Sequence, residues 1–145
     1  MAIYFYSAQD QPYGCFSNFS LHGFQLDGHW WLTSEHYYQA QKVIHTPTYD
    51  QVRAALTPEE AKKVGRAGPC RLDWDAVKDA VMERALWQKF SNHSEIRDRL
   101  LATHSELLIE NSPTDYYWGC GADGSGRNRL GEILMEVRSR LRQES

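Results

Sequence analysis

Three side chains that could move a proton or attack a carbon share one face of a predicted helix. Because successive helical residues turn by about 100°, Glu35, Gln39 and Lys42 fall within roughly 40° of one another. Glu35 lies in the first turn, just after Trp30 and Trp31, so its carboxyl is expected against aromatic surface. Desolvation there would favour a general acid or base at Glu35 and a nucleophilic amine at Lys42. A solvated face with an intrahelical ion pair is the structural alternative.

A glycine-dense segment precedes the last predicted helix. Residues 119–124 spell G-x-G-x-x-G, but the chain then runs into its final helix rather than through a strand–helix–strand unit, so a dinucleotide fold is rejected. Asn128 begins that helix, with Arg127 and Arg129 beside it. Free backbone amides, the positive end of the helix dipole and two guanidiniums would suit a phosphate group. A mobile loop before a capped helix is the alternative.

Two shorter segments are weaker candidates for binding. Phe16, Ser17, Asn18 and Phe19 offer ring faces and short hydrogen-bonding side chains, although core phenylalanines and a turn asparagine are the simpler interpretation. Arg66 follows a glycine and could bind phosphate or be merely exposed.

Neither a metal nor an organic cofactor is expected. Cys15, Cys70 and Cys120 are odd in number and far apart, and the six histidines are scattered singly, so no zinc-like spacing occurs. The three thiols are expected to be reduced, buried and inert.

Length and composition bound the class of protein. The 145 residues suffice for one domain, residues 1–145, and the net charge of −3 argues against a broad basic surface for nucleic acid. Apolar runs fall short of the roughly 20 residues of a membrane span. No basic segment leads into an apolar one after Met1, so we expect a cytoplasmic protein that does not bind membranes.

The pattern of apolar and capping residues predicts a mainly helical α+β domain. Asp27-Gly28 favours a type I′ turn in a hairpin. Thr33 or Ser34, Thr57, Asp73 and Asn92 are the expected helix caps. The expected strands are residues 3–7, 24–26, 29–31 and 107–109. The expected helices are 34–45, 58–65, 74–90, one that follows Asn92 and holds residues 96–101, and a last one that holds residues 130–141.

Together these segments resemble the NADAR superfamily, which includes the riboflavin-intermediate N-glycosidase of enteric bacteria. The resemblance covers nearly the whole chain, and Cys120 and Arg127 depart from residues common in relatives, often Asp and Lys. The matching segments are residues 16–19, 33–42, 65–66, 74, 81–82, 89–90, 115–119, 126, 128 and 130–131.

The resemblance implies a compact α+β fold and hydrolysis of a bond between a ribose carbon and a nitrogen. The superfamily's known substrates are phosphoribosylamino-pyrimidine intermediates of riboflavin synthesis and ADP-ribose attached to guanine in DNA. The resemblance also places Glu35 and Lys42 in the site. We hypothesise that Lys42 forms an imine with the ribose carbon while Glu35 and Asp115 handle protons; in a simpler version Glu35 activates water and Lys42 binds a phosphate or hydroxyl.

The remaining assignments follow from the resemblance and from the residue types. Trp118 is expected to stack on the base or ribose, and Gln39, Gly119 and Gly126 to line the site. Phosphate would meet Arg66, Arg127, Arg129 and Asn128. Phe16 and Phe19 are expected to face the ligand, whereas the core is expected to hold Tyr4, Phe5, Tyr6, Phe24, Trp30 and Tyr37.

Two alternatives stay open at this stage. A non-catalytic reader of ADP-ribose or nucleotide could use the same pocket, although retention of Glu35, Lys42 and Asp115 favours an enzyme. ADP-ribosylated DNA would need a small basic rim, which Arg127, Arg129, Arg138, Arg140 and Arg142 could supply, and a solvated face is the alternative for these arginines. The sequence leaves the oligomeric state, the role of Cys120 and the choice of substrate open.

Overall fold

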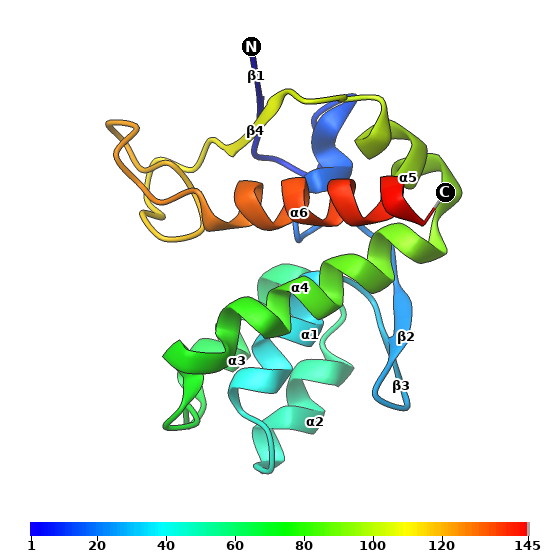
Figure 1. Ribbon diagram of the computed structural model, residues 1–145. Coiled ribbons are helices and arrows are strands. Elements are labelled where there is room, and N and C mark those ends of the chain that lie inside the picture. The colour runs from blue at the N-terminus through cyan, green and yellow to red at the C-terminus, as the bar shows by residue number, and fades with distance from the viewer. Residues whose placement is uncertain (145) are drawn as a thin grey trace. The chain divides into compact units, whose positions relative to one another are not determined.

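The computed structural model describes residues 1–144 (Figure 1). Helices dominate, and the strands form two small two-stranded sheets, which confirms the α+β class predicted from the sequence. The chain divides into two compact units, one made of residues 1–20 with the chain from Phe90 onward, the other of residues 21–89. Each unit is described by itself.

The unit of residues 21–89 begins with the predicted hairpin. Strands β2 (Phe24–Leu26) and β3 (His29–Trp31) pair antiparallel. Asp27 and Gly28 between them have φ values of 54° and 79°, the left-handed conformations that a type I′ turn requires, and this confirms the hairpin. The pleat turns Trp31 inward, whereas Trp30 is 52% exposed. The expectation of Trp30 in the core is therefore wrong, because alternate strand residues face opposite sides.

Three helices follow the hairpin. Helix α1 (Ser34–Lys42) is capped by Thr33, whose hydroxyl accepts a hydrogen bond from the amide of His36 at 3.1 Å. It ends at Lys42 rather than near His45, and α2 (Pro47–Ala54), which the sequence pattern did not predict, begins at Pro47. Helix α3 (Pro58–Ala67) has the predicted Thr57 cap, accepting from the amide of Glu60 at 3.1 Å.

The apolar core of this unit lies among the hairpin, the three helices and most of α4 (Trp74–Asn92). The ring of Trp31 meets that of Tyr37 edge to face at 5.2 Å. This packing fixes α1 against the hairpin that precedes it. The buried core residues are Phe24, Trp31, Tyr37, Ala40, Val43, Val52, Ala55, Ala61, Trp74, Val81 and Ala85.

The other unit is organised around helix α6 (Arg129–Gln143) and a parallel strand pair, β1 (Ala2–Phe5) with β4 (Leu107–Glu110). Figure 1 shows α6 running beside β4. Gly131 allows this approach, since a Cβ there would collide with the carbonyl of Leu108. The predicted apolar stripe of the last helix is confirmed as buried: Leu130, Ile133, Leu134, Val137 and Leu141.

A 3-10 turn, Tyr13–Phe16, and helix α5 (Ser94–Leu101) complete this unit. The cap of α5 is His93 rather than Asn92, because α4 continues through Asn92. On the β1 side, Tyr4 and Tyr6 are 58% and 51% exposed, so their assignment to the core is wrong, whereas Phe5 is buried.

Cys15 and Cys120 are buried free thiols, as predicted, but Cys70 is exposed. None of the helices formed by residues 1–144 has the length and apolar character that a membrane span requires. Among the same residues, no cluster of three or more His, Cys, Asp or Glu side chains could hold a metal ion.

Candidate functional site

Glu35 is a carboxylate withdrawn from water at the start of α1. The Thr33 cap and the edge-to-face packing of Trp31 on Tyr37 hold this first turn against the hairpin. Only 7% of Glu35 is exposed, which places it against the interior, as its position after the tryptophans predicts. A carboxyl in such surroundings is suited to proton transfer, because burial penalises its charged form.

Gln39 follows one helical turn later and is bonded to Glu35. Its Nε2 donates a hydrogen bond of 2.8 Å to Oε2 of Glu35, and Gln39 itself is 3% exposed. Gly65 of α3 lies against the Gln39 side chain, since an added Cβ would sit 2.7 Å from the Gln39 Cβ. The carboxylate and the amide that share a predicted face are thus brought together.

Lys42 closes α1 two turns after Glu35. It is partly exposed, and its backbone carbonyl accepts a hydrogen bond of 2.9 Å from the amide of Arg71. The negative end of the helix dipole favours a cation at this position. Arg66, on α3, is exposed, which matches the simpler of its two interpretations.

In the other unit, Asp115 shapes a turn. Its Oδ1 accepts hydrogen bonds from the amides of Tyr117 at 2.9 Å and Trp118 at 2.7 Å, and its own amide donates to Oγ of Ser112 at 3.2 Å. One carboxylate oxygen therefore fixes the backbone that presents Trp118, a structural role that the sequence did not indicate. Gly119 follows in a crowded position, where a Cβ would lie 2.8 Å from that of Ser112.

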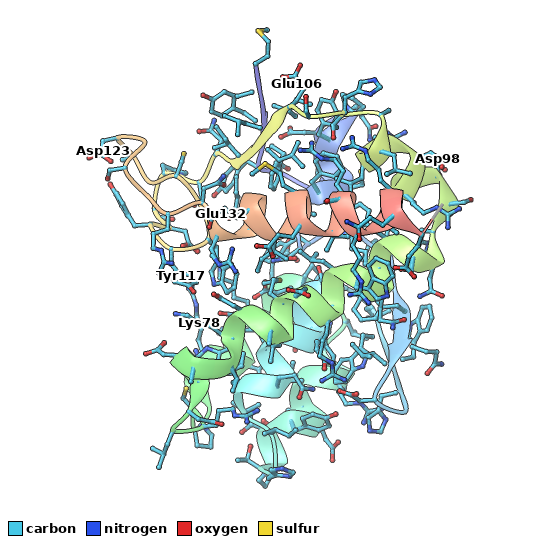
Figure 2. The ribbon with its side chains drawn as sticks, viewed as in Figure 1. Lys78, Asp98, Glu106, Tyr117, Asp123 and Glu132 are labelled. Atoms are coloured by element: carbon cyan, nitrogen blue, oxygen red, sulfur yellow. The ribbon has the colours of Figure 1, made fainter. Side chains whose placement is uncertain are left out.

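An aromatic and cationic stack stands on the same loop. Figure 2 shows Tyr117 on the segment that leads into α6, and Asp123 at the tip of the loop between Tyr117 and α6. The guanidinium of Arg127 lies 5.0 Å from the centre of the Tyr117 ring, and the Trp118 ring meets that of Tyr117 edge to face at 4.9 Å. Arg127 is exposed and Trp118 partly so, which leaves both accessible to a planar or anionic ligand.

Four successive amides at the start of α6 already have hydrogen-bond acceptors within the loop. The amides of Arg127, Asn128, Arg129 and Leu130 donate to the carbonyls of residues 116, 119, 117 and 118 at 2.9 to 3.1 Å. The expectation of free donors is wrong for these four amides, because the loop folds back and pairs with itself. Gly126 serves this pairing: its amide donates to the carbonyl of Cys120 at 2.7 Å.

Asn128 and Arg129 are also engaged within this unit. The Asn128 side chain accepts from the amide of Glu110 at 2.9 Å and donates to the carbonyl of Leu108 at 2.8 Å, which joins β4 to α6. Arg129 pairs with Glu132 and Glu136 at 3.3 and 3.5 Å. Of the two arginines predicted to bind phosphate in this unit, Arg129 is therefore paired with carboxylates, whereas the side chain of Arg127 is exposed.

Comparison with known proteins identifies the chain's relatives. The sequence model of the NADAR domain matches residues 4–142. The chain belongs to the NADAR domain family. This confirms the family resemblance predicted from the motifs.

Named relatives cover the NADAR chain almost entirely. It is 51% identical to an N-glycosidase of Nostoc punctiforme, over 98% of this chain and 94% of the relative, and 45% identical to N-glycosidase YbiA of Escherichia coli, over 96% and 88%. The NMR structure of the E. coli protein YbiA superposes with a TM-score of 0.91 at 44% identity, covering 99% of this chain and 86% of that one. At the level of enzyme class, the N-glycosidase prediction is confirmed.

A plant relative is much longer. The NADAR chain is 38% identical to the chloroplastic riboflavin biosynthesis protein PYRR of Zea mays over 96% of its own length, which spans 25% of that protein.

The motif of residues 16–19 divides between core and surface. Phe16 is fully buried, with ring contacts to Phe5 at 5.7 Å and Phe90 at 6.0 Å, so its assignment to a ligand surface is wrong. Ser17 is 8% exposed and its Oγ accepts from the amide of Phe19 at 3.1 Å, forming a local turn. Asn18 and Phe19 are partly exposed and remain candidates for binding.

Of the arginines considered for a basic rim on DNA, Arg138 is excluded by its burial, whereas Arg140 and Arg142 are exposed. Arg138 is buried and donates to Oγ1 of Thr103 and the carbonyl of Glu106, both at 2.8 Å, and burial lowers its pKa. Arg142 donates to the carbonyl of His104, and Arg140 pairs with Glu144 at 3.7 Å.

Sequence reasoning missed one ionisable residue. Lys89 is fully buried on α4, although the sequence singled it out only within a family motif. Its spacing of three and four from Leu86 and Ala85 puts it on the apolar stripe of that helix, and this was the available signal.

Proposed function

We propose that this NADAR chain hydrolyses the bond between C1 of a ribose and a nitrogen of a pyrimidine, with a phosphoribosylamino-pyrimidine intermediate of riboflavin synthesis as substrate. The observation that carries the proposal is the buried Glu35 carboxylate, bonded to Gln39 at 2.8 Å on the helix that ends in Lys42. The maize relative's name supports this substrate class. The match to residues 4–142 supports treating both units as one functional domain.

Protons are the first requirement of this reaction. As the C1–N bond breaks, the departing nitrogen takes up a proton and C1 gains oxocarbenium character. A water molecule then adds its oxygen to C1 and gives up a proton. Glu35 performs both transfers, as acid and then as base, so that one proton leaves and one returns in each cycle. Asp115 is assigned a second proton-handling role through Oδ2, since Oδ1 is held by two amides.

Lys42 admits two roles in this scheme. In one, its neutral amine attacks C1, the base leaves with a proton, the ribose ring opens to an imine, and water hydrolyses the imine to regenerate the lysine. In the other, water attacks C1 directly and Lys42 binds a hydroxyl or phosphate.

Fewer residues are proposed to bind the substrate than the sequence suggested. Trp118 and the Arg127–Tyr117 stack are proposed to meet the base and the phosphate. Asn18, Phe19 and Arg66 are retained as surface contacts to substrate. Asn128, Gly119 and Gly126 shape the loop that carries the stack. We also propose a cytoplasmic location, because the proposed substrate is a soluble phosphorylated metabolite.

Two substrates assayed side by side test the proposal. The purified chain is incubated with the phosphoribosylamino-pyrimidine and, separately, with a guanine-ADP-ribosylated DNA strand, and the released pyrimidine and ADP-ribose are quantified. We expect pyrimidine release. Release from the DNA alone would instead assign the ADP-ribosyl-guanine class. Tight ADP-ribose binding without release from either substrate would indicate a non-catalytic reader and contradict the proposal.

A further inference from the structure

Gln39 is a buried amide with a partner at one end only. Nε2 donates to Oε2 of Glu35 at 2.8 Å, whereas Oε1 is buried and accepts no hydrogen bond from any residue of the described chain. A buried acceptor without a donor is destabilising, and such atoms in native proteins call for an explanation. A purely structural core position would be filled better by an apolar side chain, so the amide at position 39 calls for another reason.

Gly65 supplies the space that this amide occupies. A Cβ built there would lie 2.7 Å from the Cβ and 3.1 Å from the Cδ of Gln39, closer than side-chain atoms pack, and nearer still to Oε1. Gly65 is itself buried, in the last turns of α3. Any larger residue at position 65 would push the Gln39 amide out of its place beside Glu35.

The geometry points to Gln39 as a positioning residue that holds Glu35 in both of its protonation states, with Gly65 as the residue that makes room for it. This inference rests on the proposed function, because that function makes Glu35 alternate between acid and base. Towards the carboxylate, Nε2 donates. Towards the protonated acid, half a rotation about the Cγ–Cδ bond presents Oε1 as the acceptor.

The rotation is cheap because the two ends of the amide are similar in size and the outer end has no partner to lose. An amide is the side chain that can do this, since it carries a donor and an acceptor on one planar group. Methionine matches its length but serves neither state. A glutamate at this position can serve Glu35 only while the two carboxyls share a proton.

The first test compares kcat, KM and melting temperature for Gln39→Met and a matched control. Gln41 is the control, because it is a second buried glutamine on α1, 5% exposed, whose Nε2 also lacks a hydrogen bond. We expect Gln39→Met to lower kcat about 10- to 100-fold with KM within about twofold, since misplacing a reacting group costs on this scale. Gln41→Met should leave kcat within about twofold.

Gln39→Glu separates a chemical role from a structural one. It keeps the size of the side chain, so a purely structural role predicts activity with the wild-type pH profile. Positioning predicts activity confined to the acidic side, where the introduced carboxyl and that of Glu35 still hold one proton between them, and hence an alkaline limb at lower pH than that of the wild type.

A double-mutant cycle tests Gly65. Gly65→Ala should lower kcat in the wild-type background about as much as Gln39→Met does, but should have less than about a twofold further effect in Gln39→Ala, where the displaced side chain is absent. Gly68→Ala is the control, since its Cβ would meet Thr48 at 2.7 Å and Val43 at 3.0 Å rather than Gln39. If Gln39→Met does not fold, Gly65→Ala provides the kcat readout.

Two failures are distinguishable. A wild-type chain that releases no base from the ribosyl substrate contradicts the proposed function and this role with it. An active wild type whose Gln39→Met variant retains kcat within about twofold, or loses no more than Gln41→Met, contradicts this inference alone.

Discussion

The hydroxyl of Tyr37 donates a hydrogen bond of 2.7 Å to Oδ2 of Asp27, in the turn of the preceding hairpin. Oδ1 of the same carboxylate accepts from Nη2 of Arg84 at 2.6 Å. Asp27 thus ties α1, which carries Glu35, to β2–β3 and to α4. Three elements of one unit are fastened at a single side chain.

Removal of that hydroxyl should weaken the unit without abolishing the fold. We expect Tyr37→Phe to lower the free energy of unfolding by about 1.5–3 kcal/mol, the usual contribution of a hydrogen bond to a charged partner. Burial raises the pKa of Tyr37, and the bond to Asp27 raises it further. The neutral phenol therefore stabilises the fold fully below about pH 10 and progressively less above it.

Urea unfolding at pH 7 and pH 11 measures both effects. Tyr4→Phe is the control, because Tyr4 is 58% exposed. An unfolding free energy unchanged in Tyr37→Phe at pH 7 would contradict the role assigned to the Asp27 carboxylate.

Local signals in the sequence account for much of this unit. The Thr33 and Thr57 caps and the Asp27-Gly28 turn are set by neighbours within a few residues, and all three were predicted. Helix α2 was missed because Pro47 indicates the end of one helix as readily as the start of the next.

Features that depend on distant parts of the chain could not be predicted. The parallel pairing of β1 with β4 joins segments about a hundred residues apart. The amides at the start of α6 find partners only because residues 116–119 fold back over them. Phe16 is indistinguishable by residue type from a ligand-facing ring until its neighbours Phe5 and Phe90 are placed.

The buried surroundings of His36 predict that the folded protein loses stability in mild acid. Its Nδ1 lies 2.8 Å from Oγ1 of Thr33 and its Nε2 lies 3.0 Å from the carbonyl of Ala55, an arrangement that suits the neutral ring. Burial lowers the pKa of His36. Because the unfolded chain takes up this proton first, the stabilisation is complete above about pH 6.5 and is lost as pH falls towards the folded-state value.

We expect the free energy of unfolding to fall between pH 7.5 and pH 5.5 by up to about 1.4 kcal/mol per pH unit from this group. His36→Asn should remove that dependence, and His104→Asn, at an exposed left-handed position, should retain it. Equal slopes in both variants would assign the acid sensitivity to other residues.

Arg127 is expected to contribute to binding rather than to chemistry. Arg127→Ala should raise KM about tenfold and leave kcat within about twofold, because one charge-assisted contact to phosphate is lost. Arg140→Ala, at the other end of α6, is the control. The effect should vanish with a substrate that lacks the phosphate, and its persistence there would exclude a phosphate contact.

Lys42 decides between the imine and direct attack by water. If Lys42 forms the imine, borohydride added during turnover should trap one sugar adduct on the wild type, seen by intact mass, and Lys42→Ala and Lys42→Arg should both lose activity. No adduct, with most turnover retained in Lys42→Ala, would leave direct attack by water.

Glu35→Gln tests the central claim most directly. The measurement is kcat/KM for pyrimidine release from the phosphoribosylamino-pyrimidine, with the melting temperature of the same samples. Proton transfer by Glu35 predicts a loss of about 10²- to 10⁴-fold at an unchanged melting temperature. A folded Glu35→Gln variant that keeps kcat/KM within about threefold of wild type would contradict the account.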